Sequence, residues 1–243
     1  MEQKGSKPPY DFKAGAVLLF DKPMGWTSFD VVNKVRYSLK RLLQVRKIKV
    51  GHSGTLDPLA TGLLIICTGK FTKRLTDMQG LPKTYTGSIT LGGTTPSYDL
   101  ETEIDQTFPT EHITTALLET ARQSYMGPIE QIPPMFSAIK MGGEALYKKA
   151  RKGIQVELKT RPVEIFRFDI DQTAFPVIDF EVDCSKGTYI RSLAYDFGKA
   201  VQSGAHLSAL RRTKVGEFRI EDAWNLEEFI AYVNGLMPSE EDV

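Results

Sequence analysis

Cysteine, histidine and long apolar runs are all scarce in this sequence. The two cysteines, Cys67 and Cys184, each stand in an apolar run and outside any CxxC pair, which predicts reduced thiols in a protein core and argues against a disulfide framework. The three histidines lack metal-ligand spacing, so we expect no metal site. The longest apolar run, residues 63–67, suits a buried strand and is too short to cross a membrane.

Both ends of the chain are polar. Residues 1–14 contain Pro8 and Pro9 and no apolar stretch, which indicates a flexible leader and not a signal peptide. Hydrophobic residues make up 41% of the chain, enough to pack a core, so a wholly disordered protein is excluded. We therefore expect one cytoplasmic domain over residues 15–235, with an acidic tail at residues 236–243.

The net charge of +1 hides an asymmetry along the chain. Residues 221–243 carry seven acids and no base, so residues 1–220 carry a net charge of +8. Residues 31–50 hold seven bases and no acid, a pattern that suits a phosphate backbone. A solvated helix face would show the same pattern, and charge alone leaves both interpretations open.

Hydrophobic periodicity predicts a mixture of strands and helices without a regular βαβ repeat. Thr27 or Ser28 can cap a helix whose apolar stripe begins at Phe29, and Thr110 can cap another that ends near residue 125. Further helices are expected at residues 71–78 and 189–200 and from residue 225 onward. Strands are expected at residues 16–21, 48–50, 63–67, 84–91, 162–171, 177–184 and 206–218. This arrangement favours an α+β fold with a largely antiparallel sheet.

One glycine-rich loop combines features of a reactive site. Residues 51–64 read GHSGTLDPLATGLL and place Asp57 directly before Pro58, between two expected strands. The proline restricts Asp57 to extended backbone, so its carboxylate stands on a constrained loop. An Asp-Pro pair is also an ordinary turn, and without further information that reading is favoured.

Residues 51–64 do not stand alone. Long motifs recur at residues 15–28 (GAVLLFDKPMGWTS), 83–85 (KTY), 131–140 (QIPPMFSAIK), 184–191 (CSKGTYIR) and 204–212 (GAHLSALRR). In this order they resemble the TruB family of pseudouridine synthases over residues 15–230. The resemblance implies a pseudouridine synthase fold of the α+β class, with a mixed, largely antiparallel central sheet flanked by helices. It also implies that the basic segment at residues 131–161 is an inserted thumb that contacts RNA.

The resemblance implies a role for individual residues around the target base. Asp57 corresponds to the family's catalytic carboxylate, which can act as a covalent nucleophile. Arg191 is implied as the guanidinium that keeps this carboxylate ionised in a dry pocket. Tyr85 is implied as the ring that stacks on the target uracil. Leu210 would line the same pocket, although core packing explains it nearly as well, and Tyr189 would contact the substrate.

Other residues are implied in holding the RNA. The target base must leave its stack to be reached, and His52 is expected to fill the gap that it leaves. Lys22 is expected mainly to shape the turn that supports the site. Phosphate contacts are expected from the helix within residues 31–50 and from the thumb lysines Lys140, Lys148, Lys149 and Lys152.

The implied reaction converts uridine to pseudouridine in the TΨC loop of tRNA, at position 55. It exchanges a C–N bond for a C–C bond without gain of an electron, water or group, so we expect no cofactor. We also expect tRNA, through its T arm, as the partner of a monomer with no obligate protein partner, and no C-terminal PUA-like domain. The alternatives are a non-catalytic tRNA-binding or tRNA-folding protein and a guide-RNA-dependent synthase. A nucleoside hydrolase would need a second carboxylate or a metal, and neither occurs in these motifs.

Overall fold

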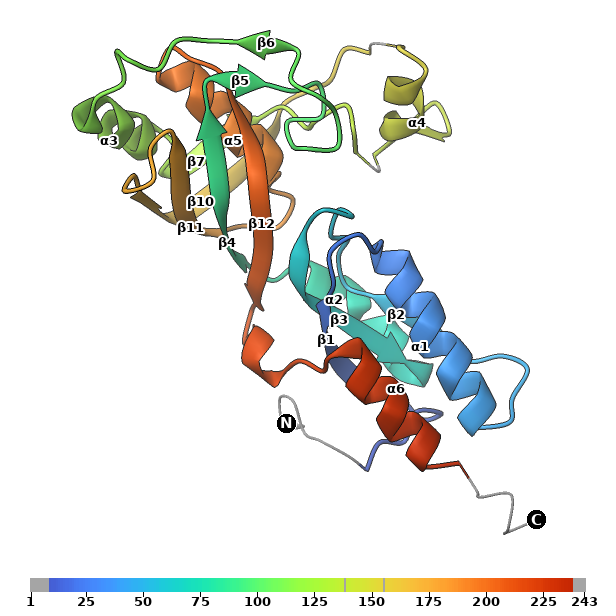
Figure 1. Cartoon of the computed structure of the whole chain (residues 1–243). Coiled ribbons are helices and arrows are strands. Elements are labelled where there is room, and N and C mark those ends of the chain that lie inside the picture. The colour runs from blue at the N-terminus through green and yellow to red at the C-terminus, as the bar shows by residue number, and fades with distance from the viewer. Residues whose placement is uncertain (1–8, 138, 155, 238–243) are drawn as a thin grey trace. The chain divides into compact units, whose positions relative to one another are not determined.

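A computed structural model of the chain describes residues 9–137, 139–154 and 156–237 (Figure 1). These residues divide into two compact units. Unit 1 holds the residues through Thr84 and those from Arg211 onward, and unit 2 holds residues 85–210. Two strands, β4 (Lys83–Leu91) and β12 (Ala205–Val215), have residues in both units.

Unit 1 combines short strands with helices from both ends of the chain. Its strand β3 (Thr61–Thr68) pairs in antiparallel fashion with β1 (Val17–Lys22) and β2 (Val50–His52), and in parallel with β12. β13 (Phe218–Arg219) is antiparallel to β12. The helices are α1 (Ser28–Leu42), α2 (Leu75–Gln79) and α6 (Leu226–Gly235), with 3₁₀ helices η1 (Gly69–Arg74) and η2 (Ile220–Asp222).

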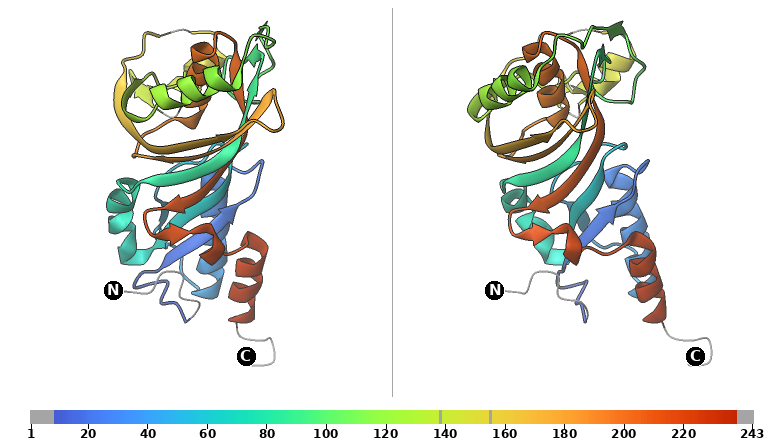
Figure 2. Two further views of the ribbon diagram at one scale, coloured as in Figure 1. Left: turned by 90° about the vertical axis from the view of Figure 1, so that its left-hand side faces the viewer. Right: turned by 60° about the vertical axis from the view of Figure 1, so that its left-hand side comes forward.

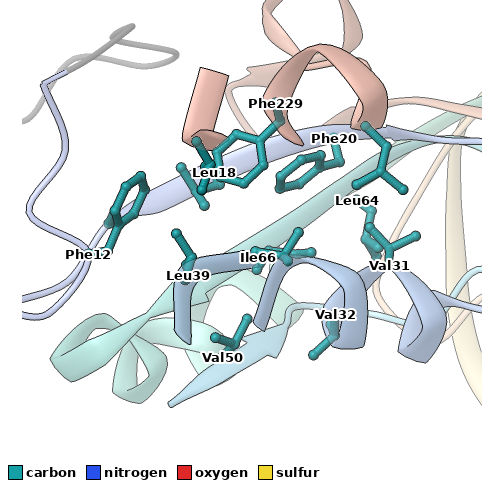
Figure 3. Close-up of a cluster of buried hydrophobic side chains, with 14 residues drawn as sticks. Phe12, Leu18, Phe20, Val31, Val32, Leu39, Val50, Leu64, Ile66 and Phe229 are labelled. Carbon is teal, nitrogen blue, oxygen red and sulfur yellow. The ribbon is translucent and has the colours of Figure 1, made fainter. Parts of the chain in front are cut away.

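The main core of unit 1 lies between α1, α6 and the strands β1–β3. Figure 3 shows Phe20 of β1 and Phe229 of α6 among aliphatic side chains of α1 and β3. The rings of Phe20 and Phe229 meet edge to face, with centroids 5.0 Å apart, a favoured aromatic geometry. α1 and α6 lie side by side (Figure 1). This core fixes β1, α1 and β3, and the loop that carries Asp57 leads directly into β3.

Helix α1 confirms the predicted cap and corrects one predicted core position. Thr27 accepts a bond from the Asp30 N–H, and the Asp30 carboxylate accepts one from the Thr27 N–H, which forms a capping box. Val31, Val35 and Leu39 are fully buried. Phe29, assigned from the sequence to this apolar stripe, is instead 60% exposed, because at 3.6 residues per turn it lies about 120° around the helix from Val35 and about 160° from Val31.

Unit 2 is built around an antiparallel set of strands. β10 (Arg161–Asp171) pairs with β11 (Val177–Cys184) on one side and with β7 (Gly127–Gln131) on the other. Helices α3 (Thr115–Ser124) and α5 (Ile190–Ala200) lie on the same side of β10 and β11 (Figure 2). Phe168 of β10 packs edge to face against Phe197 of α5, with ring centroids 5.8 Å apart. The smaller elements are β5 (Gly93–Thr94), β6 (Gln106–Thr107), β8 (Lys140–Met141), β9 (Glu144–Ala145) and α4 (Leu146–Arg151).

The predicted fold class is confirmed. The longest hydrogen-bonded strand order is β1-β3-β12-β4-β11-β10-β7, a mixed sheet whose pairs are mostly antiparallel. Both cysteines are buried, and neither forms a disulfide within the described residues, as expected of core thiols.

Several element boundaries differ from the sequence-based expectation. α3 is capped by Thr114, whose side chain accepts from the Leu117 N–H, and not by Thr110, whose carbonyl belongs to the preceding turn. The helix expected at residues 71–78 is η1 followed by α2, and the segment 131–161 contains β8, β9 and α4.

Candidate active site

The loop that carries Asp57 is held on both sides of that residue. On one side, the buried Ser28 hydroxyl accepts a 2.8 Å bond from the Leu56 N–H and donates a 3.2 Å bond to the Leu56 carbonyl. On the other side, the Pro58 carbonyl accepts a 2.8 Å bond from the Gly25 N–H. The Asp57 carbonyl also accepts from the Ala60 N–H at 3.1 Å. Asp57 therefore stands, half-buried, on backbone that its neighbours hold in place.

Lys22 is a fully buried ammonium beneath this loop. Its Nζ donates to the carbonyls of Pro23 at 2.9 Å, Trp26 at 2.6 Å and Pro58 at 3.4 Å. Burial lowers the pKa of Lys22 to about 8, the Asp57 carboxylate opposes that shift, and Arg212 adds to it. The lysine thus ties the 22–26 turn to the Asp57 loop, as expected, and it also places a positive charge within electrostatic reach of the carboxylate.

A second buried cation, Arg212, supports the start of the same loop. Arg212 is 2% exposed, and its guanidinium donates to the Leu63 carbonyl at 2.8 Å and to the Gly54 carbonyl at 3.1 Å. The Gly54 N–H in turn donates to Nδ1 of His52 at 3.3 Å. Burial lowers the pKa of His52, and the Arg212 charge lowers it further. A neutral His52 is the form suited to contact with an uncharged base.

In unit 2, Arg191 in the first turn of α5 is also buried, at 4% exposure. Its guanidinium donates to the carbonyls of Ser97 at 3.1 Å and Phe136 at 2.8 Å, and its Nε lies 3.7 Å from the Asp99 carboxylate. Phe136 lines a cavity of about 570 Å³ beside α5. Arg191 is therefore not a surface residue, and its guanidinium joins two loops of unit 2 to helix α5.

The start of α5 also binds the strand end that leads into the thumb segment. The Tyr189 N–H donates to Oε1 of Gln131 at 2.7 Å, and Nε2 of Gln131 donates back to the Tyr189 carbonyl at 3.0 Å. Ser192 donates to the Ile132 carbonyl at 2.7 Å. These bonds join two of the segments that the sequence singled out, residues 131–140 and 184–191.

The remaining predicted site residues lie on strands and in the thumb. Tyr85 of β4 is 9% exposed, and Leu210 of β12 is half-buried. Both belong to unit 2 with Arg191, whereas Asp57, His52 and Lys22 belong to unit 1. A single pocket formed by the two groups stays a prediction.

The thumb lysines differ in their surroundings. Lys148 is exposed and Lys149 is half-buried, both on α4. Lys152 forms a 2.7 Å ion pair with Glu144, which offsets its charge within the segment. Lys140 lies in β8, and its side chain is outside the described residues.

Sequence reasoning missed three supporting side chains. Ser28 was considered only as a possible helix cap, and Arg212 and Gln131 were quoted within motifs without a role. Arg212 and Gln131 are polar residues that the structure buries to 2% exposure, each bonded to backbone of a predicted site segment. Their position inside long motifs was the available signal.

Residues 9–137, 139–154 and 156–237 contain neither a candidate metal site nor a candidate membrane-spanning helix. No group of three or more His, Cys, Asp or Glu side chains there is placed to hold a metal ion. No helix in those ranges has the length and apolar character needed to cross a bilayer.

Solved structures with this fold define the class. The chain resembles a protein chain in the crystal structure of a Cbf5-Nop10-Gar1 complex, with a TM-score of 0.69 and 27% sequence identity over 94% of this chain and 58% of that chain. It also resembles a chain in an H/ACA RNP bound to a substrate RNA containing 2'-deoxyuridine, with a TM-score of 0.65 and 25% identity, over 91% of this chain and 54% of that one. The fold is that of a pseudouridine synthase, an isomerase that acts on uridine in RNA.

Sequence comparison narrows this class to one family. The model of the TruB family pseudouridylate synthase (N terminal domain) matches residues 40–190, and that of the tRNA pseudouridylate synthase B C-terminal domain matches residues 191–240. The chain belongs to the TruB family of pseudouridylate synthases.

Close relatives carry the same family name. The chain is 55% identical to the tRNA pseudouridine synthase B of Flavobacterium johnsoniae over 222 residues, which is 91% of this chain and 97% of the relative. It is 57% identical to that of Phocaeicola vulgatus over 219 residues, 90% of this chain and 93% of the relative.

Proposed function

We propose that this enzyme converts uridine to pseudouridine in tRNA, at position 55 of the TΨC loop, with Asp57 as its catalytic carboxylate. The observation that carries the proposal is the tethered loop: Ser28, Gly25 and Lys22 hold the residues on both sides of Asp57. Relatives that share more than half of its residues are named tRNA pseudouridine synthase B.

The geometry suits covalent catalysis by a carboxylate. A rigid loop presents the nucleophile without a conformational search, which lowers the entropic part of the barrier. The buried ammonium of Lys22 attracts the Asp57 carboxylate and opposes the penalty for taking that charge out of water. In the proposed reaction the C–N glycosidic bond breaks and a C–C bond forms between C1′ and C5 of the base. C5 loses its hydrogen as a proton and N1 takes up a proton, so that the product is an isomer of the substrate.

The proposed roles of the residues in unit 2 follow from the family resemblance and from their burial. Tyr85 presents a buried ring for the flipped uracil, and the half-buried Leu210 lines the same pocket. Arg191 supplies a buried guanidinium for Asp57, in addition to its bonds to Ser97 and Phe136. His52, as a neutral imidazole, occupies the space that the flipped base leaves in the RNA.

Tritium release from tRNA labelled with [5-³H]uridine tests the reaction. The wild-type chain should release tritium without a guide RNA, which separates the proposal from a guide-dependent synthase and from a protein that only binds or folds tRNA. Asp57→Asn keeps the size of the side chain, removes the nucleophile and should abolish release, whereas binding of tRNA should be retained.

A matched control for this variant is Asp77→Asn, which changes an exposed carboxylate on α2 of the same unit. It should release tritium at the wild-type rate. Substantial turnover by Asp57→Asn would show that another group performs the chemistry. The same proposal includes that the protein is a monomer without an obligate protein partner. Sedimentation at the assay concentration measures its oligomeric state.

A further inference from the structure

Helix α1 exposes two aromatic rings to solvent. Phe29 and Tyr37 are 60% and 62% exposed, although aromatic side chains gain most from burial. The two residues lie about 12 Å apart along the helix axis, given a rise of about 1.5 Å per residue. The opposite side of α1 is already filled, because Val31, Val35 and Leu39 are buried in the core of unit 1. The two exposed rings are therefore not part of the core of unit 1.

This surface begins at the loop that carries Asp57. Ser28, which precedes Phe29, is the residue bonded to Leu56. The turn before α1 is bonded to Pro58, and Met24 in that turn is 64% exposed. The first turn of α1 therefore lies beside the Asp57 loop, within reach of nucleotides that neighbour a uridine at Asp57.

An open hollow lies next to these rings. It has a volume of about 470 Å³ and is lined by Gly25, Trp26, Asp30, Asn33 and Lys34. Its one carboxylate, that of Asp30, already accepts bonds from Thr27 within the capping box. The hollow is thus lined by both an aromatic residue, Trp26, and a basic residue, Lys34.

Apart from Asp30, the charged side chains of α1 are positive. Lys34 and Arg41 are exposed and Lys40 is half-buried, and residues 31–50 contain no acid. The Arg41 guanidinium lies 6.0 Å from the centre of the Tyr37 ring. Arg36 differs, because its guanidinium is committed to Asn33 and to the Val50 carbonyl. We define the α1 stripe as Phe29, Lys34, Tyr37, Lys40 and Arg41.

We propose that the α1 stripe and the hollow beside Trp26 bind unpaired nucleotides of the substrate RNA next to the target uridine. The aromatic rings stack on bases, which is a sequence-tolerant interaction, and the three cations contact the phosphates between them. The combination of exposed aromatic and basic groups complements a polyanion with flat bases better than it complements a protein surface. This inference rests on the proposed function, because Asp57 defines where the target uridine lies.

Binding is measured in the Asp57→Asn background, so that turnover does not interfere. The ligands are a fluorescent T-arm hairpin and the same hairpin with abasic loop nucleotides around the target uridine. The added change Phe29→Ala with Tyr37→Ala should weaken binding of the intact hairpin at least about 20-fold, since each stacked base contributes about fivefold or more. The same change should alter binding of the abasic hairpin less than twofold.

Two controls separate stacking from charge and from general damage. Phe166→Ala removes a ring that is 49% exposed on β10 and should leave both affinities unchanged. Replacing Lys34, Lys40 and Arg41 together by Gln should reduce the slope of log affinity against log salt by about 2, because three phosphate contacts are lost. The same replacement of the exposed bases Lys70, Lys73 and Arg219 should leave that slope unchanged.

Either of two results would overturn the inference. In the first, the combined Phe29 and Tyr37 changes reduce the affinity for the intact and the abasic hairpin equally, or reduce neither. The other is a wild-type dimer in sedimentation that the Phe29 and Tyr37 changes convert to a monomer, which would assign the stripe to a second copy of this chain. Tritium release by the wild-type chain reports separately on the proposed function, so the two failures are distinguishable.

Discussion

Replacing Ser28 by Ala should loosen the Asp57 loop while leaving helix α1 intact. The Ser28 side chain is 2% exposed and Leu56 is 4% exposed, so water does not readily replace the two hydrogen bonds between them. A buried backbone N–H without a partner costs about 1–3 kcal/mol. We therefore expect the free energy of unfolding to fall by about 1–3 kcal/mol in this variant.

The same change should act on catalysis beyond its effect on stability. Leu56 immediately precedes Asp57, so freeing its backbone lets the carboxylate move away from the reacting atoms. Misplacement of a reacting group by about 1 Å can lower a rate by about 100-fold, and we expect kcat to fall by about 10- to 100-fold. KM for tRNA should change little, because the RNA-contacting side chains are untouched.

Ser38→Ala is the matched control on the same helix. Ser38 is 4% exposed, but its hydroxyl donates to the Lys34 carbonyl within α1, at 3.2 Å, and not to the Asp57 loop. Urea unfolding and tritium release measure both variants below their unfolding transitions. If Ser28→Ala and Ser38→Ala have the same kcat, the hydrogen bonds between Ser28 and Leu56 do not position Asp57, and the structural argument for this loop is refuted.

Three further predictions concern buried charge, close packing and the thumb. The pKa of Lys22 in the folded state, about 8, lies below its value in the unfolded chain, so the unfolded chain binds more protons between about pH 8 and 10.5. The free energy of unfolding, measured with urea, should therefore rise with pH across that range, and Lys22→Met should remove this rise. Gly62→Ala should lower the free energy of unfolding by about 2 kcal/mol or more, because Gly62 has a φ of +104° and the added methyl would lie 2.3 Å from the Arg212 carbonyl oxygen. A denaturation curve identical to that of the wild type would contradict this close approach. Replacing the thumb residues Lys148, Lys149 and Lys152 together by Ala should flatten the slope of log tRNA affinity against log salt. An unchanged slope would show that the thumb segment does not contact the RNA.

Local pattern was enough to predict much of the fold. Thr27, one of the two expected caps, caps α1, and α6 begins next to Asn225 as expected, because a helix start depends on residues within one turn of it. The strands at β1, β3, β10 and β11 follow from short apolar or alternating runs. Asp57 was identified by the resemblance of residues 51–64 and five further motifs to the TruB family, because the Asp-Pro pair read alone favoured an ordinary turn.

Only the tertiary structure showed what holds that aspartate in place. Ser28 reaches Leu56 across 28 residues, and Arg212 reaches Gly54 across 158. It likewise showed that Phe29 faces solvent and that Arg191 is buried. A serine or an arginine has the same local signature whether it meets solvent or a distant carbonyl. Its partner is decided when the core brings separate segments together, because burial then requires each polar atom to find one.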